Sequence, residues 1–216
     1  MLDSLIDYNA TDLLALLKKR DISGVELVDR CIQQYYDVNP ALNAVVETNF
    51  EEARKLFKKF DDEFSTDGHP EPFLPLPVGV KDLNDVKGLK TTFGSPLFKN
   101  NVAKSDDDVV AQIKKASAVI FGKTNVPEHG FGATTTNPLQ GSTGNPFDKS
   151  LSAGASTGGG AAAVASGIVP LATGSDFAGS LRTPASFCGI AGMRPSNGVV
   201  GTNRRSNIWS PFDVEG

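Results

Sequence analysis

Histidine and cysteine are scarce in this sequence, which has two of each among its 216 residues. Cys31 and Cys188 cannot form the disulfide framework of a small secreted protein, so we expect a reducing, cytoplasmic location. His69 and His129 lack the paired spacing of zinc ligands, and we expect no metal and no cofactor. Because His69 lies in a polar, proline-flanked stretch typical of a surface loop, a Ser-His-Asp triad would have only His129 to use. Nucleophilic chemistry in this chain therefore needs another base.

Long hydrophobic runs and a strong excess of one charge are also missing. No apolar stretch approaches the roughly 20 residues of a membrane-spanning helix, and the first residues lack the basic-then-apolar layout of a signal peptide. The formal net charge is −4, which argues against a broad electrostatic grip on nucleic acid. Hydrophobic residues make up 39% of the chain and charged ones 21%, which excludes the fibrous and disordered classes. We expect one globular domain, with neither nucleic acid nor membrane as a partner.

Helical and strand patterns alternate along the chain. Apolar residues recur at helical spacing over residues 13–20 and again after Ser23, a predicted N-cap, until Asn39 and Pro40 are expected to end the helix. The sequence further predicts helices at residues 50–64, 105–117 (capped by Ser105) and 161–165, and strands at residues 44–47, 76–82, 118–121 and 169–173. This alternation favours an α/β fold with a central sheet.

Residues 151–200 are rich in glycine and poor in charge. They contain ten of the 22 glycines but only three charged residues, Asp176, Arg182 and Arg194. Such a composition indicates tightly packed, buried backbone rather than a flexible linker. We expect the small-residue helix to approach the sheet closely, and we expect Asp176 and Arg182 to form a structural charge pair. The chemistry of the protein is expected in this region.

Three short motifs have competing explanations. Residues 122–124 resemble the end of a phosphate-binding loop, but Ser117 stands where that loop requires glycine. Residues 154–158 fit the G-x-S-x-G nucleophile elbow of α/β-hydrolases, although no strand pattern precedes them and no histidine follows His129. The three glycines at residues 158–160 open a helix whose N-terminus is able to hold an anion, and close helix packing explains them equally well.

Three separated segments, GVKD at residues 79–82, GASTGGG at 154–160 and GSDFAGSLRTPA at 174–185, together resemble the amidase signature family of amide hydrolases. Supporting matches occur at residues 122–125, 145–148 and 188–195, and the resemblance extends from about residue 10 to the C-terminus. It implies a mixed central β-sheet flanked by helices. The whole of 1–216 would be one amidase signature domain, with a helical region of about 1–70 and a catalytic core of about 75–200. Relatives are longer, so the fold is expected to be incomplete at its C-terminus.

The resemblance implies a Ser–Ser–Lys triad. Ser180 takes the nucleophile position, Ser156 the bridging position after a cis peptide bond, and Lys81 the position of the base. A free lysine, with a pKa of about 10.4, is a poor base at pH 7, but burial in a nearly charge-free site lowers that pKa. The residues implied for the oxyanion hole and acyl pocket, besides the Ser180 amide, are Phe177, Ala178, Gly179 and Gly130.

Each triad position also has a structural explanation. Lys81 fits the solvated end of a strand, and Ser156 and Ser180 fit the N-caps of the helices that follow them. Relatives usually carry a second serine where this chain has Thr157, and a glycine where it has Ala178. The substrate of any one relative therefore does not transfer to this chain.

The function that the resemblance implies is hydrolysis of the carbon–nitrogen bond of a small linear amide through an acyl-enzyme. The alternatives are the glutamine-hydrolysing subunit of a tRNA-dependent amidotransferase and a non-catalytic scaffold or binding subunit. Expected partners are a small-molecule amide and either a second copy of the chain or a complementing C-terminal segment. Because missing strands would leave the Gly/Ser-rich core unsupported, we expect residues 1–216 alone to be poorly soluble or inactive.

Overall fold

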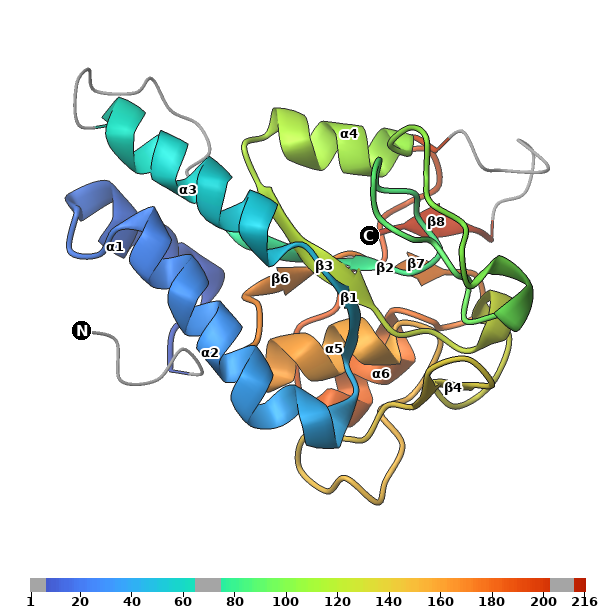
Figure 1. Cartoon of the computed structure of the whole chain (residues 1–216). Coiled ribbons are helices and arrows are strands. Elements are labelled where there is room, and N and C mark those ends of the chain that lie inside the picture. The colour runs from blue at the N-terminus through green and yellow to red at the C-terminus, as the bar shows by residue number, and fades with distance from the viewer. Residues whose placement is uncertain (1–6, 65–74, 203–211) are drawn as a thin grey trace.

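A four-stranded mixed sheet lies at the centre of the structure, a computed structural model that describes residues 7–64, 75–202 and 212–216 (Figure 1). The strand order is β1-β3-β2-β6, with β2 parallel to β3 and β6, and β1 antiparallel to β3. These strands are β1 (Val45–Thr48), β2 (Pro77–Lys81), β3 (Val119–Thr124) and β6 (Leu171–Ala172). The predicted mixed α/β sheet is confirmed. His69, expected in a surface loop, lies outside the described residues.

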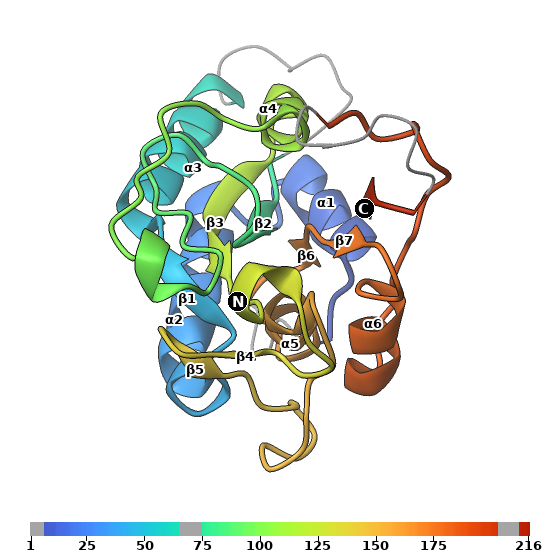
Figure 2. The ribbon, with the colours of Figure 1, turned by 90° about the vertical axis from the view of Figure 1, so that its right-hand side faces the viewer.

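Helices cover both faces of this sheet. Figures 1 and 2 place α4 on one side of the sheet and α5 on the other, and Figure 2 shows α2 near β1 and α1 near β6. The helices are α1 (Ala10–Lys19), α2 (Gly24–Leu42), α3 (Phe50–Phe64), α4 (Asp108–Lys115), α5 (Gly158–Ala165) and α6 (Arg182–Cys188). Two short ribbons, β4 (Thr136–Asn137) with β5 (Gly141–Ser142) and β7 (Ser175–Asp176) with β8 (Val214–Glu215), and the 3-10 turns η1 (Pro96–Phe98) and η2 (Glu128–Gly130) complete the described elements.

The hydrophobic core is divided by β3. Successive side chains of a strand point to opposite faces, and every residue of β3 is buried. Val119 and Phe121 belong to the larger cluster, which includes residues of α1, α2, α3 and α5. Ile120 belongs to the smaller one, with Val80 of β2 and Val110 of α4. Because both faces are covered, β2 and β3 are apolar runs rather than alternating ones.

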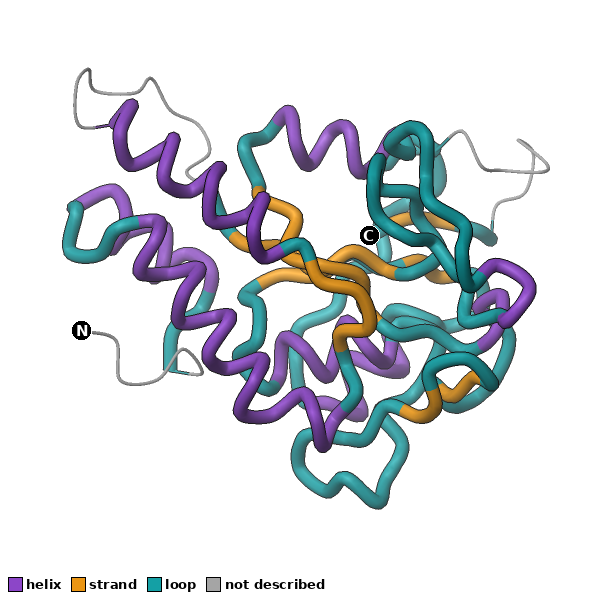
Figure 3. The backbone as a smooth tube through the Cα atoms, in the orientation of Figure 1, coloured by secondary structure: helices purple, strands orange, loops and turns teal. Residues whose placement is uncertain are grey.

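Loops gather beyond the carboxyl ends of β2 and β3, where Figure 3 shows long teal segments. In sheets with parallel strands this end is the usual place for a ligand site, because the loops that follow neighbouring strands meet there. Residues 122–124, which resemble the end of a phosphate-binding loop in sequence, form no loop, since they are the last residues of β3. Lys123 is fully buried and its Nζ lies 3.0 Å from Asp82 Oδ1. The phosphate-loop explanation is therefore wrong.

The helix α2 confirms one sequence prediction and corrects another. Ser23 forms the predicted N-cap, in a capping box with Glu26. The helix does not end at Asn39 and Pro40, however, but continues for two residues to a left-handed Asn43. Pro40 lacks the N–H that would bond the preceding turn, so other contacts must hold this end of the helix. The Asn39 side chain also ties this last turn to β1, accepting from the backbone N–H groups of Ala44 and Val45 at 2.9 and 2.8 Å.

The start of α4 is also corrected. Ser105 was predicted to cap it, but the helix begins at Asp108 after an Asp107 N-cap. The reason is tertiary: the Asp106 carboxylate accepts from the Lys87 N–H at 2.7 Å, and the Asp107 carboxylate from the Asp85 N–H at 2.8 Å. These acidic residues therefore hold an adjacent loop instead of forming a first helical turn.

The small-residue helix α5 packs as closely against the sheet as its sequence predicts. The N–H of Gly159 donates to the carbonyl oxygen of Asn125 at 3.2 Å. A Cβ added at Gly159 would overlap the backbone of Asn125 and lie 2.8 Å from the Ala44 carbonyl oxygen. The predicted strand before α6 is shorter than expected, because only Leu171 and Ala172 pair with β2.

We expect Gly159→Ala to destabilise the protein by about 1–3 kcal/mol, because the added methyl group overpacks the contact between α5 and the end of β3. The loss should occur although alanine favours a helix by about 1 kcal/mol over glycine. Gly201→Ala is the matched control, since a Cβ there meets nothing within 4 Å. Urea unfolding midpoints measure the difference. Equal midpoints for the two variants would contradict the close packing.

Candidate active site

The amine of Lys81 lies where three chain segments meet. Lys81 is the last residue of β2, and its side chain is fully buried, which excludes the solvated strand end. Its Nζ is 2.8 Å from Ser156 Oγ, 2.9 Å from Thr157 Oγ1 and 2.9 Å from Ser175 Oγ. It also donates to the Ser175 carbonyl oxygen at 3.3 Å. Two segments far from Lys81 in the sequence, at residues 156–157 and at Ser175, thus present hydroxyl groups to its amine.

Burial changes the protonation of this lysine. Removal from water disfavours the ammonium and lowers the pKa of Lys81 to about 7, while the negative charges of Glu215, Asp213 and Asp176 oppose that change. A substantial fraction of Lys81 is therefore uncharged near neutral pH. An uncharged amine next to a hydroxyl group is able to accept its proton.

Ser156 follows a cis peptide bond, Ala155–Ser156. It is 3% exposed and does not cap α5, because the N-cap of that helix is Thr157, which forms no side-chain capping bond. No strand lies between β5 and α5 among the described elements. The chain around Ser156 therefore lacks the strand that a nucleophile elbow requires.

Ser180 lies on the loop before α6, next to the segment that carries Ser156. Its carbonyl oxygen accepts from the Thr157 N–H at 3.1 Å. Ser180 does not cap α6, since the N-cap position belongs to Leu181. Both serines are in the described part of the chain, and no hydrogen bond joins their hydroxyl groups there. The backbone bond to Thr157 nevertheless joins the two serine loops at this point.

The residues expected for the oxyanion hole and acyl pocket differ in their surroundings. The Gly179 N–H donates to Asp176 Oδ1 at 2.8 Å, so a carboxylate already occupies this amide. Phe177 is 61% exposed, and Ala178 is exposed as well. Gly130 lies beside Ser156, because a Cβ added there would be 3.8 Å from Ser156 Oγ.

Asp176 forms the predicted pair with Arg182, and the geometry is bidentate. The Arg182 Nε and Nη2 donate to the two carboxylate oxygens, each at 3.0 Å. Arg194 lies 3.4 Å from the same carboxylate, a contact that sequence reasoning missed. Burial alone would raise the pKa of Asp176, but the Arg182 guanidinium and the amides of Gly179 and Leu181 hold it well below its usual range. The pair fixes the loop that carries Ser180.

Sequence reasoning missed three neighbours of Lys81. Thr157 stands out in the sequence only as a departure from the relatives, although its hydroxyl is one of the contacts of the amine. Ser175 belongs to the glycine-rich motif, and its hydroxyl group was the only feature in the sequence that could have marked it as a partner of Lys81. Glu215 stands in a segment without any recognisable pattern, so nothing in the sequence placed its charge near the lysine.

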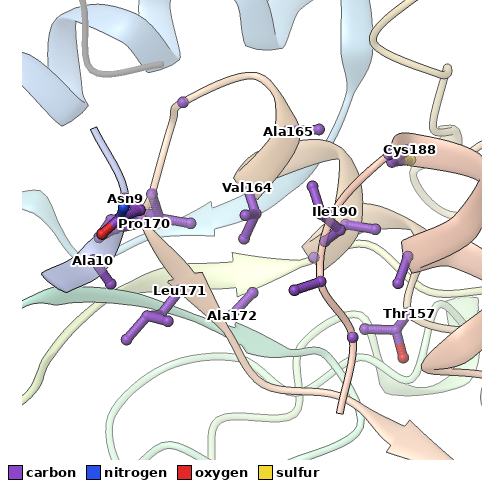
Figure 4. A pocket seen from close by; sticks show the side chains of 18 of the residues that line it. Asn9, Ala10, Thr157, Val164, Ala165, Pro170, Leu171, Ala172, Cys188 and Ile190 are labelled. Atoms are coloured by element: carbon purple, nitrogen blue, oxygen red, sulfur yellow. The ribbon is translucent and has the colours of Figure 1, made fainter. Parts of the chain in front are cut away.

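A cavity of about 700 Å³ is lined in part by Thr157 (Figure 4). The side chains around it are mostly apolar, including Val164, Leu171 and Ile190. Thr157 reaches both the cavity and the lysine, whereas Lys81, Ser156 and Ser180 do not line the cavity. The cavity therefore belongs to the packing between α5, β6 and α6 rather than to the hydroxyl cluster.

The described residues contain neither a helix suited to a membrane nor a cluster suited to a metal. No described helix has the length and apolar character that crossing a membrane requires. No group of three or more His, Cys, Asp and Glu side chains is arranged in the described ranges for holding a metal ion.

Comparison with known proteins points to one family. The family profile for amidases matches residues 26–216. The chain is 38% identical over 197 residues to a glutamyl-tRNA(Gln) amidotransferase subunit of Geobacillus thermodenitrificans, covering 91% of this chain and 41% of that protein. It is 38% identical over 192 residues to an acylamidase of Rhodococcus erythropolis, covering 89% and 40%. The crystal structure of a bacterial aryl acylamidase of the amidase signature family matches with a TM-score of 0.90 at 34% identity, over 97% of this chain and 44% of that one. The chain thus spans about 40% of the length of the curated relatives it matches.

We expect Asp176→Asn to lower the free energy of unfolding at pH 7 by about 2–3 kcal/mol, because it removes the charge that Arg182 and the loop amides bind. The depressed pKa means that this stabilisation is present above the unfolded-state value of about 3.9 and is lost as pH falls below it. The gap between wild type and variant should therefore be constant from pH 5 to 8 and about 1 kcal/mol smaller at pH 3. Urea unfolding at each pH measures it. A gap that does not narrow in acid would show that the carboxylate charge is unimportant.

Proposed function

The chain belongs to the amidase family, and on that premise we propose that it hydrolyses the carbon–nitrogen bond of a small linear amide through an acyl-enzyme on Ser180. The observation that carries the proposal is the 2.8 Å contact between the fully buried amine of Lys81 and Ser156 Oγ. Since the chain spans only part of the length of its relatives, the proposal concerns the activity of the whole protein.

The first half-reaction uses the three residues in series. Uncharged Lys81 accepts the proton of the Ser156 hydroxyl, and Ser156 takes the proton of the Ser180 hydroxyl. Ser180 Oγ then attacks the amide carbon, and a tetrahedral oxyanion forms. The proton returns through Ser156 to the departing nitrogen, which leaves as an amine or ammonia. The hydroxyl groups of Ser180 and Ser156 must approach for this transfer, as catalytic groups often do only when substrate is bound.

The second half-reaction returns the enzyme to its starting state. A water molecule gives a proton to the same relay and attacks the acyl carbon, and the carboxylic acid leaves as Ser180 recovers its proton. The amides of Phe177, Ala178 and Ser180 are the proposed oxyanion donors. The Gly179 N–H already donates to Asp176, so we assign Gly179 to shaping the loop rather than to binding the oxyanion.

A second candidate function is the release of ammonia from glutamine for a partner protein. It is supported by the 38% identity to a glutamyl-tRNA(Gln) amidotransferase subunit. The two candidates differ in substrate, so ammonia release from glutamine and amine release from a simple aryl amide, measured on the same preparation, distinguish them. A non-catalytic scaffold would release neither.

We further propose that another polypeptide segment, or a second copy of the chain, covers the cavity between α5, β6 and α6. Leu171 on this strand is 44% exposed, and Met193 near the cavity is 71% exposed. The relatives are more than twice as long as this chain, which supports a complementing segment in particular.

We expect Ser180→Ala to lower kcat by roughly 10⁴–10⁶-fold, because it removes the nucleophile. A fluorophosphonate probe should label Ser180 in the wild-type protein, as found by mass spectrometry of the tryptic peptide. Ser186→Ala, an exposed serine of α6, is the matched control and should retain full activity and labelling. Labelling of Ser156 with Ser180 untouched would contradict the assignment.

The pH profile should report Lys81 as the base. Because only the uncharged amine accepts a proton, kcat/KM should rise with pH through an apparent pKa of about 7 and level off above it. Lys81→Met should remove this rising limb and cost about 10²–10⁴-fold in rate. A variant with near-native turnover and an unchanged profile would exclude Lys81 from the mechanism.

A further inference from the structure

The β7–β8 ribbon brings Glu215 to the lysine site. In this antiparallel pair Glu215 is directly opposite Ser175, and residues directly opposite have side chains on the same face. Backbone hydrogen bonds between Gly174 and Gly216, of 2.6 and 2.9 Å, extend the pairing past Glu215. Ser175 Oγ lies 2.9 Å from Lys81 Nζ, so Glu215, opposite Ser175 in the pairing, lies on the face of the ribbon that is turned to the lysine.

The carboxyl group of Glu215 is buried and incompletely bonded. Glu215 is 8% exposed, and its Oε1 accepts from Asn84 Nδ2 at 3.3 Å. Its Oε2 is buried without a hydrogen-bond partner among the described residues. Asn84 also contacts the backbone of Lys81: the backbone N–H of Asn84 donates to the Lys81 carbonyl oxygen at 3.0 Å. A buried carboxylate with a bare oxygen is costly unless a positive charge stands nearby.

The other charges around the site are engaged differently. Asp176 is paired with two arginines. Asp213, on the same segment as Glu215, also acts on Lys81, and Asp107 acts on Glu215. Burial raises the pKa of Glu215, whereas Asn84 and the charge of Lys81 oppose that rise. Among the three carboxylates that favour the Lys81 ammonium, Glu215 has the largest effect.

We propose that Glu215 is a positioning residue whose carboxylate stabilises the Lys81 ammonium at the moment when Lys81 has accepted the proton from Ser156. The carboxylate takes no proton itself and acts through space, since no described carboxylate lies within salt-bridge distance of Lys81 Nζ. Its charge compensates the new ammonium, and the ammonium compensates the bare carboxylate oxygen. This role rests on the proposed function, in which Lys81 is the base, and it makes Glu215 the residue that adjusts the basicity of Lys81.

The test is the titration of Lys81 in the wild-type protein and in Glu215→Gln, which keeps the size of the side chain and removes its charge. Lysine labelled with ¹³C at Cε reports the titration by NMR without any turnover, and the Lys81 signal is the one absent from Lys81→Met. We expect the pKa of Lys81 to fall by at least about 0.5 units in Glu215→Gln, because an opposite charge is lost. The rising limb of kcat/KM should move by the same amount, and kcat at its plateau should fall.

Asp107→Asn is the matched control. The Asp107 carboxylate accepts from the same Asn84 amide, at 3.5 Å, whereas the carboxylates that raise the pKa of Lys81 are those of Glu215, Asp213 and Asp176. It should change stability while leaving the Lys81 titration in place. An unchanged titration in Glu215→Gln, or an equal shift in Asp107→Asn, would overturn the proposal. A different result would contradict the proposed function alone: the NMR titration shifts as expected in Glu215→Gln, but wild type and Lys81→Met hydrolyse amides at the same rate.

Discussion

The removal of one amine from water is the constraint on which the rest of this structure depends. Lys81 is fully buried, and the atoms around its Nζ are hydroxyl and carbonyl oxygens of Ser156, Thr157 and Ser175. An ammonium would be poorly solvated there, so the neutral form is populated near pH 7. The neutral amine in turn needs the hydroxyl groups within hydrogen-bond distance, which requires three chain segments to converge on a single nitrogen atom.

That convergence explains the composition of the glycine-rich region. At Gly159 the helix backbone touches the end of β3, and at Gly174 a Cβ would collide with the side chains of Leu181 and Thr157. Larger residues would separate the loops and leave Lys81 without its partners. Charge is scarce for the same reason, and where Asp176 is required to hold the loop, its partner Arg182 extends outward and is 57% exposed. Close packing and the burial of the amine therefore both favour small, uncharged residues in this region.

The sequence predicts most of the elements but few of their ends. Helical spacing and N-cap chemistry placed α2 and α3 well, because these signals are local. The ends at Pro40 and Ser105 were wrong because they depend on side chains that bond distant backbone, such as Asn39 to β1 and Asp107 to a loop. At the site, motif resemblance found Lys81 and Ser156. It missed Glu215, because its position follows from strand register with Ser175, about forty residues earlier, and register between distant segments leaves no local pattern.

A comparison of two buried lysines shows how the surroundings of the proposed base differ from those of a structural cation. Lys81 and Lys123 are both fully buried and lie near the ends of the neighbouring strands β2 and β3. Lys123 Nζ has the Asp82 carboxylate at 3.0 Å, a contact that favours the ammonium and makes it part of the scaffold. Lys123 Nζ also donates to the Thr91 hydroxyl at 3.0 Å. Lys81 Nζ contacts the hydroxyl groups of Ser156, Thr157 and Ser175, and no described carboxylate lies within salt-bridge distance of it. Hydroxyl groups accept from an ammonium and donate to an amine equally well, so they let the proton move in either direction. The surroundings of Lys81 therefore suit both forms of its lysine, which is what the proposed role of general base requires.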